Sequence, residues 1–340
     1  MHNPSVIASV AKQSSKKLSK TGLLRYARND GFCTSTSIWL SRLSLASLLL
    51  AFGVILLGAY TRLVDAGLGC PDWPGCYGQL IAPTTLQEIS AANAAFPASP
   101  VNVSKAWTEM THRYFAQLLG SLILLFAGLA YWKRQSLTLP VWLPGLLVVL
   151  VISQGILGMW TVTLRLLPLV VVSHLLGGFT LLALLWLCWL FLRSPQPHKA
   201  PRFLTFLAPG LLIILLLQIL LGGLTSANYA ALICPDFPTC QNQWWPTMTG
   251  KTAIHMLHRI GAIFTLVFGL LLAFRYYPVK APLSLCLALL LLLQVSLGIS
   301  NIVFYLPLPI AVAHNGVAAL LLLTLVTINF KLFRARGLHV

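Results

Sequence analysis

Four histidines carry most of the chemistry that this sequence could perform. His112 and His258 each stand before an arginine near the start of a long apolar run, and His174 and His314 lie near the start of two further runs. One histidine in an apolar helix is more often a hydrogen-bonded core residue than a ligand. Four histidines at matched positions favour a cofactor site instead, because polar groups inside a membrane are costly and usually functional.

Two imidazoles that face each other across a helix bundle suit heme iron. Neutral imidazole is a good axial ligand, and an apolar bundle can enclose the macrocycle. Zinc would require three or four nitrogen, sulfur or oxygen ligands, and no third strong ligand recurs beside both histidine pairs. The pattern therefore predicts two heme-type sites, with two histidines each.

The groups beside these histidines differ between the two parts of the chain. Glu109 lies one helical turn before His112 on the same face, whereas His255 takes that position in the second part. A carboxylate beside a heme could move protons or stabilise a cationic intermediate. It could equally be an acid that the helix macrodipole favours near a helix start. Arg113 and Arg259 could pair with heme propionates or contact outer lipid headgroups.

Four cysteines form two matched pairs in polar segments. Cys70 and Cys76 are the first and last residues of the motif CPDWPGC, and Cys234 and Cys240 are those of the motif CPDFPTC. Five intervening residues with two prolines can turn the chain enough for a disulfide, and disulfides persist in an oxidising compartment. The pairs are either structural disulfides or redox-active pairs. The spacing differs from C-x-x-C, which weakens an analogy with thioredoxin-like chemistry.

The elements that position these residues are membrane helices. Hydrophobic residues make up 58% of the 340 residues and charged residues only 9%, with a mean hydropathy of +0.84. A soluble domain carries about 25% charged residues, so a soluble fold is excluded. Runs of about 20 apolar residues can cross the hydrocarbon core. Eight such runs are present: 39–60, 108–132, 140–164, 169–192, 203–225, 252–274, 281–303 and 309–331.

The basic residues predict the orientation of these spans. The net charge of +17 would suggest nucleic-acid binding in a soluble protein, but here the basic residues lie in short segments between apolar runs. One set of alternate segments, including both termini, holds 17 of the 23 lysines and arginines. The positive-inside rule therefore places both termini in the cytoplasm and the cysteine pairs outside. We expect no nucleic-acid partner.

The chain is an internal duplication. Residues 57–76 align without a gap with residues 221–240, and residues 157–174 align with residues 297–314. Each half holds four spans, so both halves have the same orientation in the membrane. The sequence predicts an all-α polytopic membrane protein with eight transmembrane helices, arranged as two four-helix bundles related by a pseudo-two-fold axis along the membrane normal.

The duplication also predicts the domain organisation. We expect a disordered basic cytoplasmic tail at 1–37, an N-terminal half at 38–193, a cytoplasmic linker at 194–202, a C-terminal half at 203–332 and a cytoplasmic tail at 333–340. The tail 1–37 weakly resembles a mitochondrial transit peptide as well. The outer loop before His112 is twice as long as the one before His258, with 36 against 18 residues counted from the preceding cysteine. One half therefore has the larger lid.

From about residue 38, the chain resembles the heme A synthase family. The resemblance rests on the duplicated halves, both cysteine motifs, Glu109-x-x-His112-Arg113, His174, His258-Arg259 and His314. Members of this family oxidise the C8 methyl group of heme O to a formyl group by successive hydroxylations, which gives the heme A of terminal oxidases.

The resemblance implies an assignment of the two sites. Heme b would be the cofactor on His258 and His314, and heme O would be the substrate on His112 and His174, with Glu109 needed for activity. Paired cysteines mark the bacterial branch, which argues against a transit peptide and implies a multi-pass protein of the bacterial cytoplasmic (inner) membrane. The implied partners are heme O, heme O synthase as its supplier, an electron donor of unknown identity and membrane lipid; homo-oligomers are allowed.

Three other functions compete with this interpretation. A diheme b-type electron-transfer protein between a quinol and an outer acceptor would need ligands at two depths, whereas all four histidines lie toward one face. A membrane thiol–quinone oxidoreductase would use the cysteines but leave the histidines idle and contain no heme. A transporter is allowed by the repeat, but no buried acid–base chain supports it.

Overall fold

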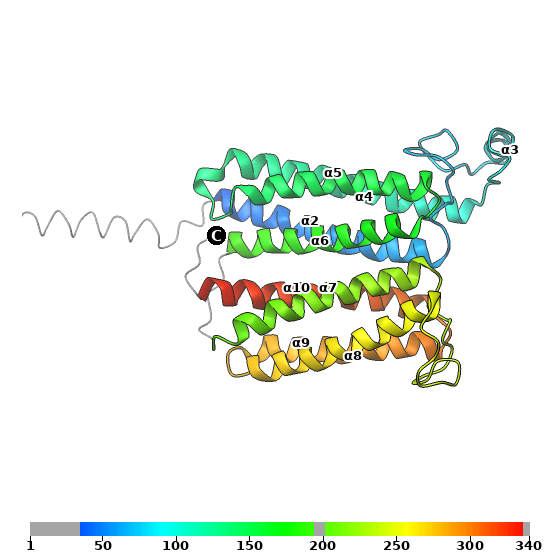
Figure 1. Ribbon diagram of the computed structural model, residues 1–340. Coiled ribbons are helices and arrows are strands. Elements are labelled where there is room, and N and C mark those ends of the chain that lie inside the picture. Colours follow the sequence, from blue (N-terminus) through cyan, green and yellow to red (C-terminus); the bar gives the residue numbers. More distant parts are fainter. Residues whose placement is uncertain (1–34, 194–200, 336–340) are drawn as a thin grey trace, which may run out of the picture.

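The computed structural model describes residues 35–193 and 201–335 and is built from helices (Figure 1). All eight predicted spans are confirmed as helices long and apolar enough to cross a membrane. They are α2 (Ser35–Leu63), α4 (Val103–Trp132), α5 (Trp142–Thr163), α6 (Pro168–Arg193), α7 (Leu204–Ala227), α8 (Gly250–Tyr276), α9 (Ala281–Val303) and α10 (Leu308–Ala335). Most of the predicted tails and linker lies outside the described residues, so the domain boundaries there stay predictions.

Two short elements were not predicted from the hydropathy pattern. Helix α3 (Leu86–Ala95) lies in the long outer loop, and a 3₁₀ turn (Arg134–Ser136) follows α4. Helix α3 begins with a capping box, in which the Thr85 hydroxyl accepts from the Glu88 amide and the Glu88 carboxylate accepts from the Thr85 amide. The cap explains why so short a polar helix forms at the surface.

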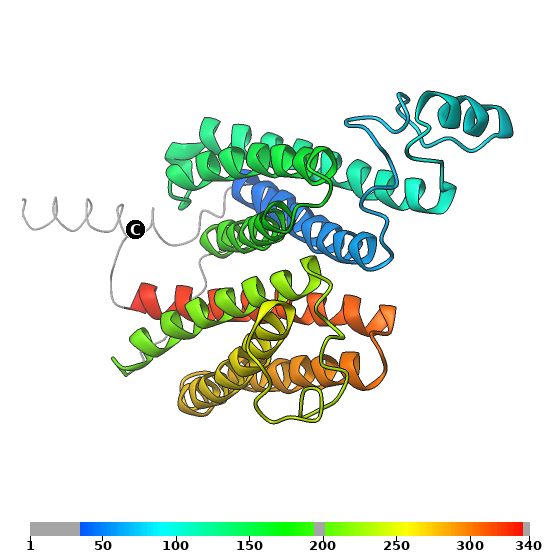
Figure 2. The same cartoon turned by 45° about the vertical axis from the view of Figure 1, so that its right-hand side comes forward.

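Each half of the chain forms a closed ring of four helices (Figure 2). In the first ring α2 packs on α4, α4 on α5, α5 on α6, and α6 on α2. The second ring repeats this order with α7, α8, α9 and α10. Across the rings α10 contacts α2 and α6, and α6 contacts α7. Exchanging the rings leaves this set of neighbours unchanged, as the duplication requires; the pseudo-two-fold axis itself stays a prediction.

The interface between the rings is the best-buried part of the molecule. Helix α10 has the largest buried share of all eight spans. It packs on α2 and α6 of the first ring as well as on α7 and α9 of its own ring. The rings of Phe191 and Phe330 meet edge to face at 4.9 Å, and Trp186 Nε1 donates to Thr327 Oγ1 at 2.8 Å. These contacts between α6 and α10 join the halves near the end that lacks the cysteine loops.

The turns that set the histidines in place are duplicated as well. Between α5 and α6, the Leu166 amide donates to the Thr161 carbonyl at 2.8 Å, and between α9 and α10 the Leu306 amide donates to the Asn301 carbonyl at 2.7 Å. Leu166 and Leu306 both have a positive φ, a conformation that residues other than glycine rarely adopt. The same tight turn therefore precedes α6 and α10, and His174 and His314 are each the seventh residue of their helix.

Candidate functional site

The four histidines lie at one end of the molecule, as predicted. Each is within the first ten residues of its helix, and α4, α6, α8 and α10 all begin at the end that carries the cysteine loops (Figure 1). His112 and His174 belong to the first ring of helices, and His258 and His314 belong to the second. The structure thus brings together the two pairs that the sequence predicted, one pair in each ring of helices.

Each of these four histidine rings packs against a glycine of the preceding spanning helix. A Cβ atom on Gly58 would lie 3.0 Å from His112 Nε2, and one on Gly222 would lie 3.1 Å from His258 Cε1. Gly158 and Gly298 stand in the same relation to His174 and His314, at 3.5 and 3.2 Å. These glycines make room for the imidazoles because they carry no side chain.

A shorter repeat within each half of the sequence marks these glycines. The pattern Q-x-x-L-G occurs at 154–158, 218–222 and 294–298, and the residues 54–58 read V-I-L-L-G. Each of the four helical hairpins therefore repeats one unit, in which a helix with Leu-Gly precedes a helix with the histidine. The glutamines of this pattern are functional candidates that spacing between histidines alone does not reveal.

The two histidines of each ring of helices suit a heme iron better than a bare metal ion, which would need three or more ligands from the protein. Among the described residues, no three of the side chains of His, Cys, Asp and Glu cluster as a metal site would require. Nδ1 of His174 and Nδ1 of His314 are buried without a hydrogen-bond partner. An imidazole pair with unsatisfied nitrogens among apolar helices is what two axial ligands of a heme require.

Glu109 is buried and fully engaged beneath the first cysteine loop. Its Oε1 pairs with Arg113 Nη2 at 2.5 Å, and its Oε2 accepts from the Cys70 amide at 2.9 Å. Arg113 Nη1 in turn donates to the carbonyl oxygens of Gly75 at 2.5 Å and Asp72 at 3.1 Å. The carboxylate therefore joins α4 to the loop, and the arginine neutralises it there.

Arg259 binds the second cysteine loop in the same way. Its Nη2 donates to the carbonyl oxygens of Cys234 and Asp236 at 2.9 Å each, and its Nη1 donates to that of Thr239 at 2.7 Å. Both arginines thus hold the loop of their own half, and the predicted contact of Arg113 and Arg259 with heme propionates stays a prediction.

His255, in the position equivalent to Glu109, is buried and does not lie on the surface. Its Nδ1 donates to the Ala230 carbonyl at 2.7 Å. The carbonyl of one loop residue thus replaces the amide that Glu109 binds in the first half. A neutral donor here cannot form the ion pair that Glu109 makes, so the two halves carry different charge at equivalent positions.

Both cysteine pairs form disulfides. The Cα atoms of Cys70 and Cys76 are 4.8 Å apart, and those of Cys234 and Cys240 are 4.5 Å apart. Each loop folds around its aspartate, which accepts from the two amides that follow the second cysteine. Asp236 binds the amides of Gln241 and Asn242 and the Thr239 hydroxyl, and these hydrogen bonds, the hydroxyl first, lower the pKa of its carboxyl.

The longer outer loop of the first half folds into a cover with a small core of its own. The ring of Tyr77 meets that of Phe96 edge to face at 5.5 Å, and both pack with the disulfide and Met110. Burial raises the pKa of Tyr77, and the charges of Asp72 and Glu109 raise it further. The larger lid predicted for this half is therefore a structured element rather than an extended strand of chain.

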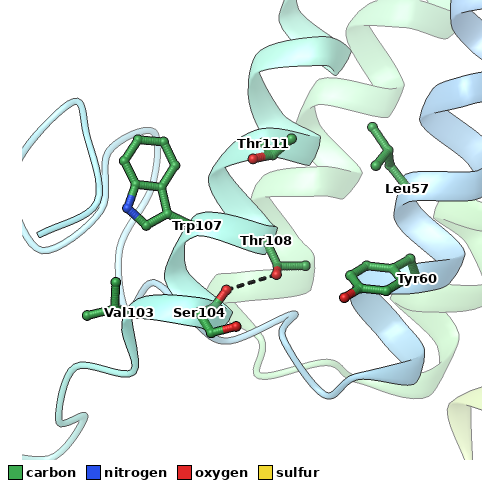
Figure 3. A pocket seen from close by; sticks show the side chains of 7 residues that line it. All are labelled: Leu57, Tyr60, Val103, Ser104, Trp107, Thr108 and Thr111. Atoms are coloured by element: carbon green, nitrogen blue, oxygen red, sulfur yellow. Dashed lines mark hydrogen bonds between the residues drawn. The ribbon is translucent and has the colours of Figure 1, made fainter. Parts of the chain in front are cut away.

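An open groove of about 380 Å³ lies between α2 and α4 (Figure 3). It is lined by Leu57, Tyr60, Val103, Ser104, Trp107, Thr108 and Thr111. Two of these residues, Leu57 and Thr111, precede Gly58 and His112 in the sequence. The wall from α4 carries hydroxyl groups and the wall from α2 is mainly hydrocarbon and aromatic, so the groove suits an amphipathic molecule.

The two halves also meet at the outer end through residues that the duplication itself relates. Arg62 Nη2 donates to the Ser226 carbonyl at 2.8 Å, and the Tyr229 hydroxyl donates to Asp65 Oδ1 at 3.0 Å; both pairs are separated by 164 residues. The Arg62 guanidinium lies 4.0 Å from the centre of the Tyr229 ring. This contact holds the outer ends of α2 and α7 together between the two histidine pairs.

Comparison with known proteins agrees with this architecture. Residues 41–326 match the COX15-CtaA family of cytochrome oxidase assembly proteins. A heme A synthase of Shewanella oneidensis is 48% identical over 324 residues, which cover 87% of this chain and 96% of that protein. Heme A synthases of Halalkalibacterium halodurans and Neorickettsia sennetsu are 25% and 27% identical, over 84% and 81% of this chain and over 94% and 93% of their own lengths.

The match spans both rings of helices, both cysteine loops and all four histidines. It therefore applies to the whole of the site and not to one span or motif. The chain belongs to the COX15-CtaA family of cytochrome oxidase assembly proteins.

Proposed function

We propose that the chain is a heme A synthase, which oxidises the C8 methyl group of heme O to the formyl group of heme A. The observation that carries this function is the presence of two matched histidine pairs in two matched helix rings, in a chain that is 48% identical to a heme A synthase over most of its length. Successive hydroxylations of one methyl carbon, followed by loss of water, remove four electrons and leave one oxygen.

We assign the substrate to the N-terminal ring and the heme b cofactor to the C-terminal ring. The first ring has the groove between α2 and α4, the folded lid and the buried carboxylate, which are features that a site with an exchanging ligand needs. The second ring has a shorter loop. Bound heme b would supply one-electron chemistry between His258 and His314.

The residues of the first ring divide the work on the substrate. His112 and His174 bind the iron of heme O and so fix the orientation of the macrocycle. The lid, held by Arg113, excludes water from the outer side. The groove between α2 and α4, with Tyr60 and Trp107 on its walls, would take the apolar tail of heme O.

Glu109 is the proposed catalytic acid–base group. It is the only acidic side chain within the eight spanning helices that the structure describes. Its contact with Arg113 favours the charged carboxylate against the cost of burial, and its contact with the Cys70 amide holds it beside the loop that covers the site. A carboxylate in this position can accept a proton during hydroxylation of the substrate.

We further propose a multi-pass protein of the bacterial cytoplasmic membrane with both termini in the cytoplasm. The relatives named above are bacterial, and the eight spans agree with a multi-pass protein. Heme O synthase would supply the substrate, and a membrane electron carrier would complete the redox cycle. Membrane lipid surrounds the rings of helices, and homo-oligomers remain compatible with the fold.

The test is heme analysis after expression in a bacterial host that makes heme O but no heme A. Chromatography and mass spectrometry of extracted hemes should show heme A or hydroxylated heme O only when the chain is present. Heme b with unchanged heme O, in a normally folded protein, would contradict the synthase and favour the diheme electron-transfer function.

A further inference from the structure

The glutamines of the repeated Q-x-x-L-G unit differ in what they contact. Gln154, Gln218 and Gln294 occupy the same place in three of the four units, four residues before the glycine that receives a histidine. The fourth unit has Val54 in this place. An amide buried in a membrane helix is costly unless it has partners, so three recurring glutamines call for a function.

In the C-terminal ring, both glutamines reach the histidines. Gln218 Nε2 lies 3.0 Å from His258 Nδ1 and donates to the His258 carbonyl at 2.9 Å. Gln294 Nε2 lies 3.2 Å from His314 Nε2. The Oε1 atoms of both glutamines are buried without a partner. In both contacts the amide Nε2 can only donate, so the facing ring nitrogen accepts. When the other ring nitrogen binds iron, the facing nitrogen carries hydrogen, and the amide has to turn so that Oε1 accepts from it.

In the N-terminal ring, no such contact is made. Val54 has no polar atom to offer His112. The amide of Gln154 lies against Gly177 as that of Gln218 lies against Gly261, but the Gln154 Nε2 is buried without a partner. No hydrogen bond joins the ring of His112 or His174 to a described residue, and Nδ1 of His174 is buried without one.

We propose that Gln218 and Gln294 are positioning residues that orient the two C-terminal imidazoles and so make this pair the permanently occupied heme site. Val54, and Gln154 with no hydrogen bond to His174, leave His112 and His174 without such support, so a porphyrin held there can exchange. The proposal rests on the proposed function, because it explains why one site keeps its heme and the other releases a product.

The physical basis is the orientation of the ligand. When the ring N–H that does not bind the metal donates to an acceptor, here the amide oxygen of the glutamine, the ring is fixed and ligand affinity rises; loss of such a partner weakens metal binding by roughly 10- to 100-fold. A preoriented imidazole pair also loses less conformational freedom on binding. The N-terminal pair lacks both advantages, which favours faster release.

The experiment measures heme release from the purified full-length protein to excess apomyoglobin in detergent. Expression in a host that makes no heme O leaves heme b as the heme to be followed. We compare Gln218→Met and Gln294→Met, which remove the amide and keep the side-chain length, with the matched control Gln154→Met. Release of heme b should accelerate roughly 10- to 100-fold in the first two variants and stay at the wild-type rate in the control.

Electron paramagnetic resonance separates orientation from general loosening of the fold. The g-values of the low-spin heme should shift in Gln218→Met and Gln294→Met, because the imidazole planes are no longer held, and should stay unchanged in Gln154→Met. If one of the two variants does not fold, the other decides. Val54→Gln offers the converse test: in a host that makes heme O, it should slow the release of heme O.

Unchanged release rates and g-values in both C-terminal variants would overturn the proposal, and so would an equal effect of Gln154→Met. These readouts do not depend on heme A formation. A chain that makes no heme A but releases heme b faster only in the C-terminal variants would contradict the proposed function and support the positioning role. A chain that forms heme A, and whose heme b release is unchanged in the glutamine variants, would support the proposed function and contradict the positioning role.

Discussion

The two cysteine loops have the same backbone plan but connect to their helix rings through different chemistry. In both, a disulfide closes the loop, an aspartate accepts from the amides that follow it, and an arginine binds the loop carbonyls. Beneath the first loop lies Glu109, ion-paired with Arg113, and beneath the second lies His255 with a single backbone contact. Duplication thus supplied one scaffold twice, and a few buried substitutions separated the two uses of it.

The largest expected difference between the halves is at Glu109 and His255. Glu109→Gln should lower heme A formation by about 100- to 10,000-fold, because the proposed acid–base group is lost. His255→Gln should change it only a few-fold, because the amide can still donate to the Ala230 carbonyl. The measurement is the ratio of heme A to heme O, with heme b per protein as the control. Loss of heme b in Glu109→Gln would assign Glu109 to folding instead.

The arginines should differ in how much stability they provide. Arg113→Met leaves the buried carboxylate of Glu109 without its counter-charge, which costs about 3–5 kcal/mol. Arg259→Met removes hydrogen bonds to neutral carbonyl groups, which costs about 1–3 kcal/mol. Thermal unfolding in detergent should therefore show the larger loss for Arg113→Met. Equal losses would mean that Glu109 is not charged when buried.

The glycines that face the histidines allow each site to be disturbed separately. Gly58→Ala should displace His112 and lower the heme O content, whereas Gly222→Ala should displace His258 and lower the heme b content. We expect a loss of roughly 10-fold in each case, which is the effect of losing a contact that orients a ligand. Gly53→Ala and Gly210→Ala lie on the same two helices with nothing within 4 Å and serve as controls. If Gly58→Ala depleted heme b, the assignment of the two sites would have to be exchanged.

The smallest effect concerns the pH dependence of the second loop. Hydrogen bonds lower the pKa of the Asp236 carboxyl, so its contribution to loop stability is present above its ordinary value of 3.8 and is lost as the pH falls through the lowered value. Amide hydrogen exchange at Gln241 and Asn242 should therefore lose protection in that acidic range. In Asp236→Asn the protection should not change with pH there; a wild-type-like pH dependence in that variant would assign the effect to another group.

Much of the architecture could be predicted because its signals are long or repeated. Runs of about 20 apolar residues define the eight spans whatever their partners, and the matched cysteine and histidine motifs reveal the duplication. Helix α3 was missed because its signal is a short polar cap in a loop, which hydropathy does not report. The partners of Arg113 and Arg259 were equally beyond prediction, since a long basic side chain near a helix start can reach a headgroup, a ligand or a loop carbonyl with similar ease.

The sequence by itself determined the membrane class, the number of spans, the duplication, the cysteine pairs and the identity of the four histidines, because apolar length and residue type act locally. Only the tertiary structure decided which glutamines reach a histidine, where Gln154 lies, what Glu109 binds and where a groove opens between α2 and α4. These depend on how closely two helices approach, and a single glycine such as Gly58 or Gly177 changes that distance by the width of a side chain.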